Sequence, residues 1–201
     1  MFRFIRNLIL VLLLAALTAG GLRICTSSDP LYTTQELLGY NRYHRYDGII
    51  RQVGHKDGVD PMLIKAVIWR ESSFRASKVG KNGERGLMQV TEAAARDWAR
   101  MVKRPGFAPD NLFTPQTNIE AGTWYLKKAL QRYAGKDDPM TFALAEYNAG
   151  KSRVDKWVGD TKQGASVTAG DLRDSISIPS TRGYVDTIIE RYRFYQKRGH
   201  L

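Results

Sequence analysis

The 201-residue sequence is poor in the side chains that bind metals or form cross-links. It has one cysteine, Cys25, and three histidines, His44, His55 and His200. A single cysteine excludes an intramolecular disulfide and any zinc or iron–sulfur site built on several cysteines. The histidines lack the paired spacing of zinc ligands, so we expect no structural metal. With 43% hydrophobic and 25% charged residues, the composition also excludes a disordered or collagen-like chain.

Acidic residues are the minority among the charged side chains. The sequence has 20 Asp and Glu against 31 Lys and Arg, which leaves a net charge of +11. A basic surface favours anionic partners such as nucleic acid, anionic lipid or anionic polymers of a cell envelope. It is equally compatible with a solvated surface that has no dedicated partner. The sequence contains no common nucleic-acid recognition motif, so we expect no nucleic-acid partner.

No uninterrupted apolar run is long enough to cross a membrane. The longest run, Leu8–Leu17, falls short of the roughly 20 residues that span a bilayer. Two arginines precede it and small residues, Thr18–Gly21, follow it, which is the order of a secretory signal peptide. We therefore predict a signal peptide over residues 1–21 and export to the periplasm or cell envelope. The alternative is that the segment is not cleaved and that residues 8–24 form a short anchor, which attaches the protein to the inner membrane.

The rest of the chain carries helical patterns and no run typical of a β-strand. Residues 22–44 are polar and mixed in character, which predicts a linker. Residues 45–201 predict one all-α domain. Each expected helix is indicated by a capping residue at its start or by apolar residues at helical spacing. These helices cover residues 46–58, 61–72, 91–101, 115–133, 139–148 and 181–197. Residues 159–171, rich in Gly, Thr and Ser, predict a surface loop.

One acidic residue lies on the apolar face of the helix expected over 61–72. Glu71 follows Ile64, Val67 and Ile68 at intervals of seven, four and three residues, so it shares their face. Burying a charged carboxylate on that face costs free energy. Desolvation therefore raises the pKa of Glu71 toward the range of a proton donor near neutral pH. The alternative is a structural glutamate paired with a nearby arginine: Arg70, Arg75 or Arg85.

Hydrogen-bonding groups of other kinds follow Glu71 along the chain. A glycine-rich loop over residues 78–85 lets the backbone approach a ligand closely. Gln89 comes directly after this loop, and Tyr147 and Asn148 stand near the end of a later predicted helix. One proton donor with several fixed hydrogen-bonding groups is what a site for a neutral sugar needs.

These residues belong to motifs that resemble those of the soluble-type lytic transglycosylases. The motifs are Glu71-Ser72, Gly-Leu-Met-Gln at 86–89, Tyr-Asn-Ala-Gly at 147–150 and Thr-Arg-Gly-Tyr-Val at 181–185, supported by stretches at 111–113 and 117–122. The resemblance covers about residues 45–197. It implies membership of the goose-lysozyme-like group, family 23 of the glycoside hydrolases, and an all-α, lysozyme-like domain.

The resemblance also implies roles for single residues. The glutamate of the first motif, here Glu71, is expected to be the sole catalytic acid and base. The residues expected to bind substrate or support the site are Ser72, Gln89, Tyr147, Asn148 and Tyr184. Ser72 would support the helix end, and the hydroxyl of Tyr184 would reach Glu71.

Gly80 and Glu146 differ from the pattern of the family, and Glu84 is a further acidic residue near the motifs. Gly80 stands where several family members have a Ser or Thr that helps to orient the substrate. Glu146 stands where alanine is common, and we expect it on the surface, paired with Lys151 or Arg153. Glu84, in the glycine-rich loop, is likewise expected to be a surface residue.

The activity implied is cleavage of the β-1,4 bond between N-acetylmuramic acid and N-acetylglucosamine in peptidoglycan glycan strands, leaving 1,6-anhydromuramic acid ends. Neither water nor a cofactor is needed for this reaction. One alternative is a lysozyme-type hydrolase of the same fold, with Glu146 or Glu84 as an additional base. Another is a non-catalytic module that binds the cell wall or takes part in assembly.

Overall fold

The structure is a computed structural model that describes residues 2–27, 29–160, 166–199 and 201. The chain forms two compact units, residues 1–45 and residues 46–201. In these described ranges the regular elements are all helices, and extended pairing is limited to isolated bridges of Arg85 with Val79 and Val90. The expected all-α fold is confirmed.

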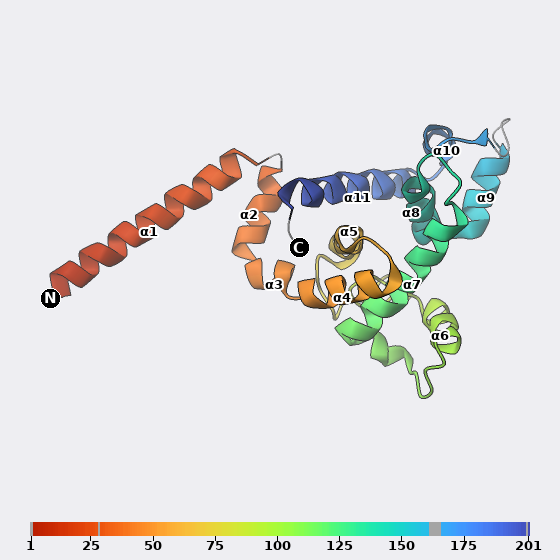
Figure 1. Ribbon diagram of the computed structural model, residues 1–201, viewed down its shortest axis with the longest axis horizontal. Coiled ribbons are helices and arrows are strands. Elements are labelled where there is room, and N and C mark those ends of the chain that lie inside the picture. Colours follow the sequence, from red (N-terminus) through yellow and green to blue (C-terminus); the bar gives the residue numbers. More distant parts are fainter. Residues whose placement is uncertain (1, 28, 161–165, 200) are drawn as a thin grey trace. The chain divides into compact units, whose positions relative to one another are not determined.

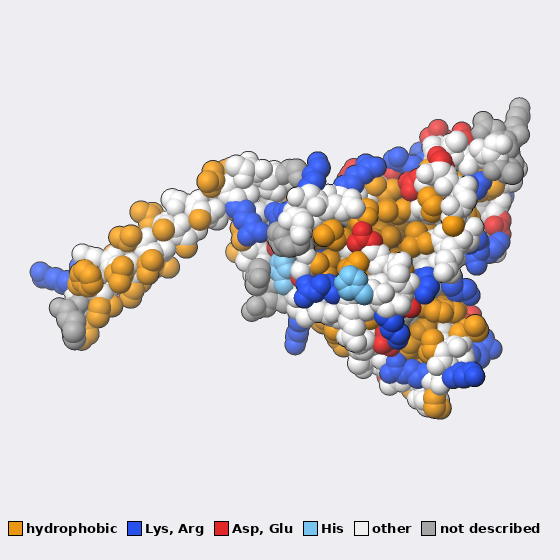
Figure 2. All heavy atoms as spheres, in the orientation of Figure 1, with side chains coloured by type: hydrophobic (Ala, Val, Ile, Leu, Met, Phe, Trp, Pro, Cys, Tyr) orange, Lys and Arg blue, Asp and Glu red, His pale blue; other side chains and the backbone are white. Residues whose placement is uncertain are grey.

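The first unit contains α1 (Phe2–Cys25), α2 (Pro30–Leu38) and α3 (Tyr40–His44). No residue of α1 is buried, and hydrophobic side chains cover the helix along its length (Figure 2). By length and composition α1 could cross a membrane, a test that signal sequences near the N-terminus also pass.

Residues 22–44, predicted as a linker, are largely helical. α1 continues to Cys25, and α2 begins directly after Asp29, whose carboxylate accepts a hydrogen bond from the amide of Tyr32 at 2.8 Å. Pro30 occupies the first helical position, where its missing N–H costs nothing. The prediction is wrong about secondary structure because an Asp-Pro pair marks a helix start as readily as a turn.

The second unit contains the helices α4 (Asp47–Asp57), α5 (Pro61–Ser72), α6 (Glu92–Met101), η1 (a 3₁₀ helix, Pro109–Phe113), α7 (Pro115–Arg132), α8 (Pro139–Ala149), α9 (Lys151–Asp160), α10 (Ala169–Ser175) and α11 (Pro179–Arg198). The predicted caps are present: Asp60, Thr91 and Asp138 each accept a hydrogen bond from the first turn of the following helix. Each cap satisfies an amide that the helix leaves unpaired.

The C-terminal part of the second unit holds two helices that the sequence analysis missed. α9 buries Val154 and Trp157 on one face, and α10 begins within the predicted loop 159–171 and continues to Ser175. Thr168 starts α10 with a capping box shared with Asp171, a signal hidden in the polar composition. Residues 161–165 of that predicted loop lie outside the described part of the chain.

Most of α5 is buried within the second unit. α11 packs against α5 and α8, α7 packs against α8 and α4, and α4 contacts α5. Figure 1 shows α5 nearly end-on between α4 and α11. Ile64, Val67 and Ile68 are completely buried in this position. Because neighbours hold α5 from several sides, its last turn is a rigid support for any side chain that projects from it.

Candidate active site

Glu71 lies in the last turn of α5 and is half-buried. Tyr184 of α11 donates a hydrogen bond from its hydroxyl to Oε1 of Glu71 at 2.6 Å. In the described part of the chain, no Lys or Arg forms an ion pair with Glu71. Glu71 is therefore not the structural glutamate paired with an arginine that the sequence left as an alternative.

The surroundings of Glu71 raise its pKa from 4.5 to about 7. Burial is the largest cause, because it disfavours the charged carboxylate. The hydrogen bond from Tyr184 and the positive charges of Lys78 and Arg70 oppose the shift, and the negative charge of Glu84 adds to it. A carboxyl group with this pKa can donate a proton near neutral pH and take one back in the next step.

Two phenols accompany the carboxyl group, the buried Tyr184 and the half-buried Tyr147. The hydroxyl of Tyr147, from α8, donates to the carbonyl oxygen of Met88 at 3.0 Å. Burial raises the pKa of Tyr147 and of Tyr184 well above 10, and the charge of Glu71 raises both further. Both phenols therefore stay protonated and act as hydrogen-bond donors at neutral pH.

The loop between α5 and α6 forms one wall of the site, and Asn118 of α7 holds it in place. Asn118 is completely buried; its Oδ1 accepts from the amide of Met88 at 2.7 Å. Its Nδ2 donates to the carbonyl oxygens of Arg85 and Leu112, at 2.7 and 2.8 Å. We did not single out Asn118 from the sequence, although it lies in the 117–122 stretch that carries part of the resemblance.

Gly86 shows why this loop needs glycine. Its φ of +79° lies in the left-handed region, and a Cβ there would lie 2.3 Å from Nδ2 of Asn118 and 2.4 Å from the oxygen of Leu112. Any side chain at this position would be strained and would also displace the asparagine that anchors the loop.

Gln89 follows this turn with a φ of +48°. Its Nε2 donates to the carbonyl oxygens of Lys78 and Gly86, at 3.1 and 2.9 Å. These two bonds fix the orientation of the amide, so that Oε1 faces the other way. Within the described residues, Oε1 accepts no hydrogen bond, which leaves it available to a ligand.

Two predicted site residues are placed differently from Gln89. Ser72 is 1% exposed, and its hydroxyl donates to the carbonyl oxygen of Ile68 one turn earlier. A buried and engaged hydroxyl offers nothing to a substrate, so the substrate-binding prediction for Ser72 is not supported, whereas support of the helix end fits its geometry. Asn148 is exposed, and its Oδ1 accepts from Thr181, which joins the end of α8 to the start of α11.

Glu146 does not have the partners that we expected. It forms an ion pair with Arg132 and accepts a hydrogen bond from the hydroxyl of Tyr133 at 2.9 Å. Lys151 pairs instead with Asp155, and Arg153 donates to the backbone. The sequence separation misled the prediction, because α7 brings Arg132 beside α8 from outside the local sequence.

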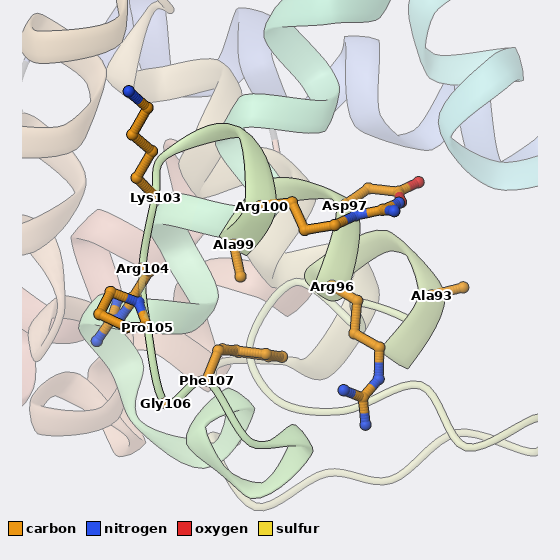
Figure 3. A pocket seen from close by; sticks show the side chains of 10 residues that line it. All are labelled: Ala93, Arg96, Asp97, Ala99, Arg100, Lys103, Arg104, Pro105, Gly106 and Phe107. Carbon is orange, nitrogen blue, oxygen red and sulfur yellow. The ribbon is translucent and has the colours of Figure 1, made fainter.

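A cavity of about 340 Å³ adjoins Gln89 and Tyr147, and Glu146 and Arg132 also line it. A larger one, about 820 Å³, lies on α6 and the segment that follows it. Figure 3 shows that its basic side chains diverge, with Lys103 and Arg96 extending in opposite directions. Its size therefore does not indicate a site, and the smaller cavity is the one lined by two of the predicted site residues, Gln89 and Tyr147.

Comparison with known proteins identifies the family to which the chain is similar. A family model described as the transglycosylase SLT domain matches residues 48–168. The chain is 32% identical to the soluble lytic murein transglycosylase of Escherichia coli K12 over 152 residues, which are 75% of this chain and 23% of that protein. It is 32% identical to the protein of the same description from Salmonella typhimurium over 160 residues, which are 79% of this chain and 23% of that protein. The chain thus spans about a quarter of the length of these relatives.

Solved structures give the same result for the fold. An inactive mutant of lytic transglycosylase Slt from Pseudomonas aeruginosa matches with a TM-score of 0.69 and 25% identity, over 81% of this chain and 26% of that one. The 70-kDa soluble lytic transglycosylase from Escherichia coli matches with the same score and identity, over 84% and 27%. A complex of a 70-kDa soluble lytic transglycosylase with bulgecin A matches with a TM-score of 0.70 at 25% identity, again over 84% and 27%.

Proposed function

The chain belongs to the transglycosylase SLT domain family, and from this membership we propose that it is a peptidoglycan lytic transglycosylase. Its substrate would be the glycan strand, cut at the β-1,4 bond between N-acetylmuramic acid and N-acetylglucosamine. The observation that carries the proposal is the Glu71 carboxyl group, which is held by Tyr184 at 2.6 Å and has its pKa raised to about 7.

The reaction uses Glu71 twice. Protonated Glu71 gives its proton to the glycosidic oxygen, and the N-acetylglucosamine side leaves as an alcohol. The N-acetyl oxygen of the muramic acid stabilises C1 from within the substrate. Ionised Glu71 then accepts the proton of the C6 hydroxyl, whose oxygen attacks C1 and closes the 1,6-anhydro ring. The carboxyl group ends protonated, as it began, and no water is consumed.

Tyr184 supports both halves of this cycle. Its hydroxyl donates to the carboxyl oxygen and stabilises the ionised form that exists between the two proton transfers. The burial of Glu71 acts in the opposite sense and keeps it protonated before the reaction. The balance of the two effects sets the pKa near the pH at which one group can serve as acid and then as base.

The hydrolytic alternative requires a second carboxylate that activates water. Glu146 is a poor candidate because Arg132 and Tyr133 both occupy its carboxylate. The discriminating measurement is the mass of the products from purified sacculi digested with the full chain. A transglycosylase releases anhydro products that are one water lighter than those of a hydrolase. A folded Glu71→Gln variant, assayed in parallel, should release no product of either kind. If the wild-type chain releases the products that are heavier by one water, the hydrolase is the correct function.

Export completes the proposal, because peptidoglycan lies outside the cytoplasmic membrane. The basic start, the apolar run and the small residues up to Gly21 support a signal peptide over residues 1–21. N-terminal sequencing of protein from fractionated cells should find a mature chain that begins near Leu22. A full-length chain recovered with the inner membrane would instead identify α1 as a retained anchor.

A further inference from the structure

Gly80 lies between α5 and α6, nine residues after Glu71, and its backbone does not require glycine. Its φ is outside the left-handed region, so an ordinary residue could adopt the same conformation. What opposes a side chain is space: a Cβ at Gly80 would lie 2.2 Å from Oε2 of Glu84 and 2.9 Å from Oε1 of Gln89. Two acceptor oxygens therefore occupy the room that a side chain at position 80 would fill.

The Glu84 carboxylate is held in this place by its own loop. Oε2 accepts from the amide of Asn82 at 3.0 Å, and Oε1 accepts from the side-chain amide of Asn82 at 2.9 Å. The amide of Gly80 donates to the carbonyl oxygen of Glu84 at 2.7 Å, which closes the turn. Partial burial raises the pKa of Glu84, but the bonds from Asn82 and the charge of Lys78 outweigh it and lower the pKa below the usual value. The group is thus an anion at neutral pH.

The oxygen of Gln89 beside it is also an acceptor. Nε2 of Gln89 is engaged by the carbonyl oxygens of Lys78 and Gly86, so the amide cannot turn to offer a donor without breaking both bonds. A carboxylate oxygen and a free amide oxygen therefore lie beside the same point. Asn82 donates to both carboxylate oxygens, but a carboxylate has about four acceptor positions and can accept further hydrogen bonds from a ligand. Hydroxyl and amide N–H groups of a sugar can donate such hydrogen bonds.

This pair of acceptors belongs to the same site as Glu71. Lys78 donates from Nζ to the backbone oxygen of Glu71, and its charge also acts on Glu84. Gln89 lines the cavity of about 340 Å³ that also adjoins Tyr147. Lys78 therefore links the acceptor pair to the backbone of Glu71, and Gln89 links it to the cavity. The charge of Glu84 also acts on the Glu71 carboxyl group.

We propose that Glu84 is a substrate-binding residue of this site. Its carboxylate, together with Oε1 of Gln89, accepts hydrogen bonds from a hydroxyl or amide N–H of a neutral amino sugar, and the missing side chain of Gly80 makes room for it. This inference rests on the proposed function, since that function makes the ligand an amino-sugar polymer.

The test is a set of variants of the full chain, assayed on purified uncross-linked glycan strands: Glu84→Ala, Glu84→Gln, Gly80→Ala and the double Gly80→Ala, Glu84→Ala variant. Loss of a hydrogen bond to a charged acceptor should raise KM roughly tenfold in Glu84→Ala, with a much smaller change in kcat. Glu84→Gln, which keeps one acceptor oxygen, should fall between. Glu190→Gln, which removes an exposed carboxylate of α11, is the matched control.

The double variant tests the shared space. The Cβ in Gly80→Ala should push the Glu84 carboxylate aside and raise KM about as much as Glu84→Ala does. Once Glu84 is alanine, the Cβ at position 80 no longer has a carboxylate to displace, so the double variant should be no worse than Gly80→Ala alone. An unchanged KM in Glu84→Ala, or effects that multiply in the double variant, would overturn the inference; thermal unfolding checks that each variant is folded.

A second measurement separates this inference from the proposed function. Binding of the same glycan strands to Glu71→Gln is measured calorimetrically, with and without Glu84→Ala. If the wild-type chain releases no anhydro product, the proposed function fails, but a roughly tenfold weaker binding in the Glu84→Ala background would still support a sugar-binding Glu84. If the wild-type chain cleaves and binding is the same in both backgrounds, only the role of Glu84 is wrong.

Discussion

Glu71→Gln should make the folded chain more stable above neutral pH while it abolishes cleavage. In the folded chain the pKa of Glu71 is about 7, against 4.5 for an exposed glutamate. Below pH 4.5 the group is protonated in both the folded and the unfolded chain, and it has no effect on the balance. Between pH 4.5 and pH 7 the unfolded chain loses this proton while the folded chain keeps it, so stability falls as the pH rises.

The magnitude follows from the same two values. A difference of one pH unit corresponds to ~1.4 kcal/mol, so the free energy of unfolding should fall by roughly 3 kcal/mol between pH 4.5 and pH 8 on account of Glu71. Glutamine removes this dependence because it carries no charge at any pH. It also keeps an oxygen for the hydroxyl of Tyr184, so the packing against α11 remains.

Urea unfolding of the wild-type chain and of Glu71→Gln, followed by circular dichroism at pH 5 and pH 8, measures this effect. The stability advantage of the variant should grow by roughly 2–3 kcal/mol between the two pH values. Glu190→Gln, an exposed change of the same kind, serves as the control. A pH-independent difference, or a variant that is less stable than the wild type at pH 8, would refute the argument that burial sets the pKa of Glu71.

Three further outcomes follow from contacts in the site. Tyr184→Phe removes the donor that favours ionised Glu71, so the alkaline limb of the pH–rate profile should move up by roughly one to two pH units. The maximal rate should also fall about ten- to a hundredfold. An alkaline limb at the wild-type pH would contradict this prediction. Glu146→Gln should keep most of the activity in the product-mass assay, because its carboxylate is bound to Arg132; a variant as inactive as Glu71→Gln would favour two-carboxylate hydrolysis. Asn118→Ala leaves the amide of Met88 and the carbonyl oxygen of Leu112 without their partner and should lower the free energy of unfolding by roughly 3 kcal/mol in a denaturant titration; a loss below about 1 kcal/mol would show that water replaces the side chain.

The sequence by itself determined the local structure wherever the deciding interaction lies within one turn. Asp60 before Pro61 and Asp138 before Pro139 mark helix starts because each cap bonds to an amide two residues ahead. The apolar spacing of α5 also placed Glu71 on a buried face. The same local reasoning failed at residues 22–44 and 159–171, where polar caps looked like loops.

Only the tertiary structure decided what surrounds the carboxyl group. Tyr184 is 113 residues away from Glu71 along the chain, and Asn118 reaches the loop at Met88 across 30 residues. The resemblance named Tyr184, but no periodicity in the sequence gives its distance or burial. Glu146 pairs with Arg132 of α7 and not with Lys151 or Arg153, the nearby cations that the sequence suggested.

The physical reason is the range of the forces involved. Caps and periodic apolar faces depend on neighbours within about four residues, so they can be predicted from the sequence. A pKa near 7 depends on burial, on one phenol from another helix and on charges from a loop, and these meet only when α5, α8 and α11 have packed together. The close approach of the Glu84 carboxylate to Gly80 has the same origin, because the turn that joins them exists only in the folded loop.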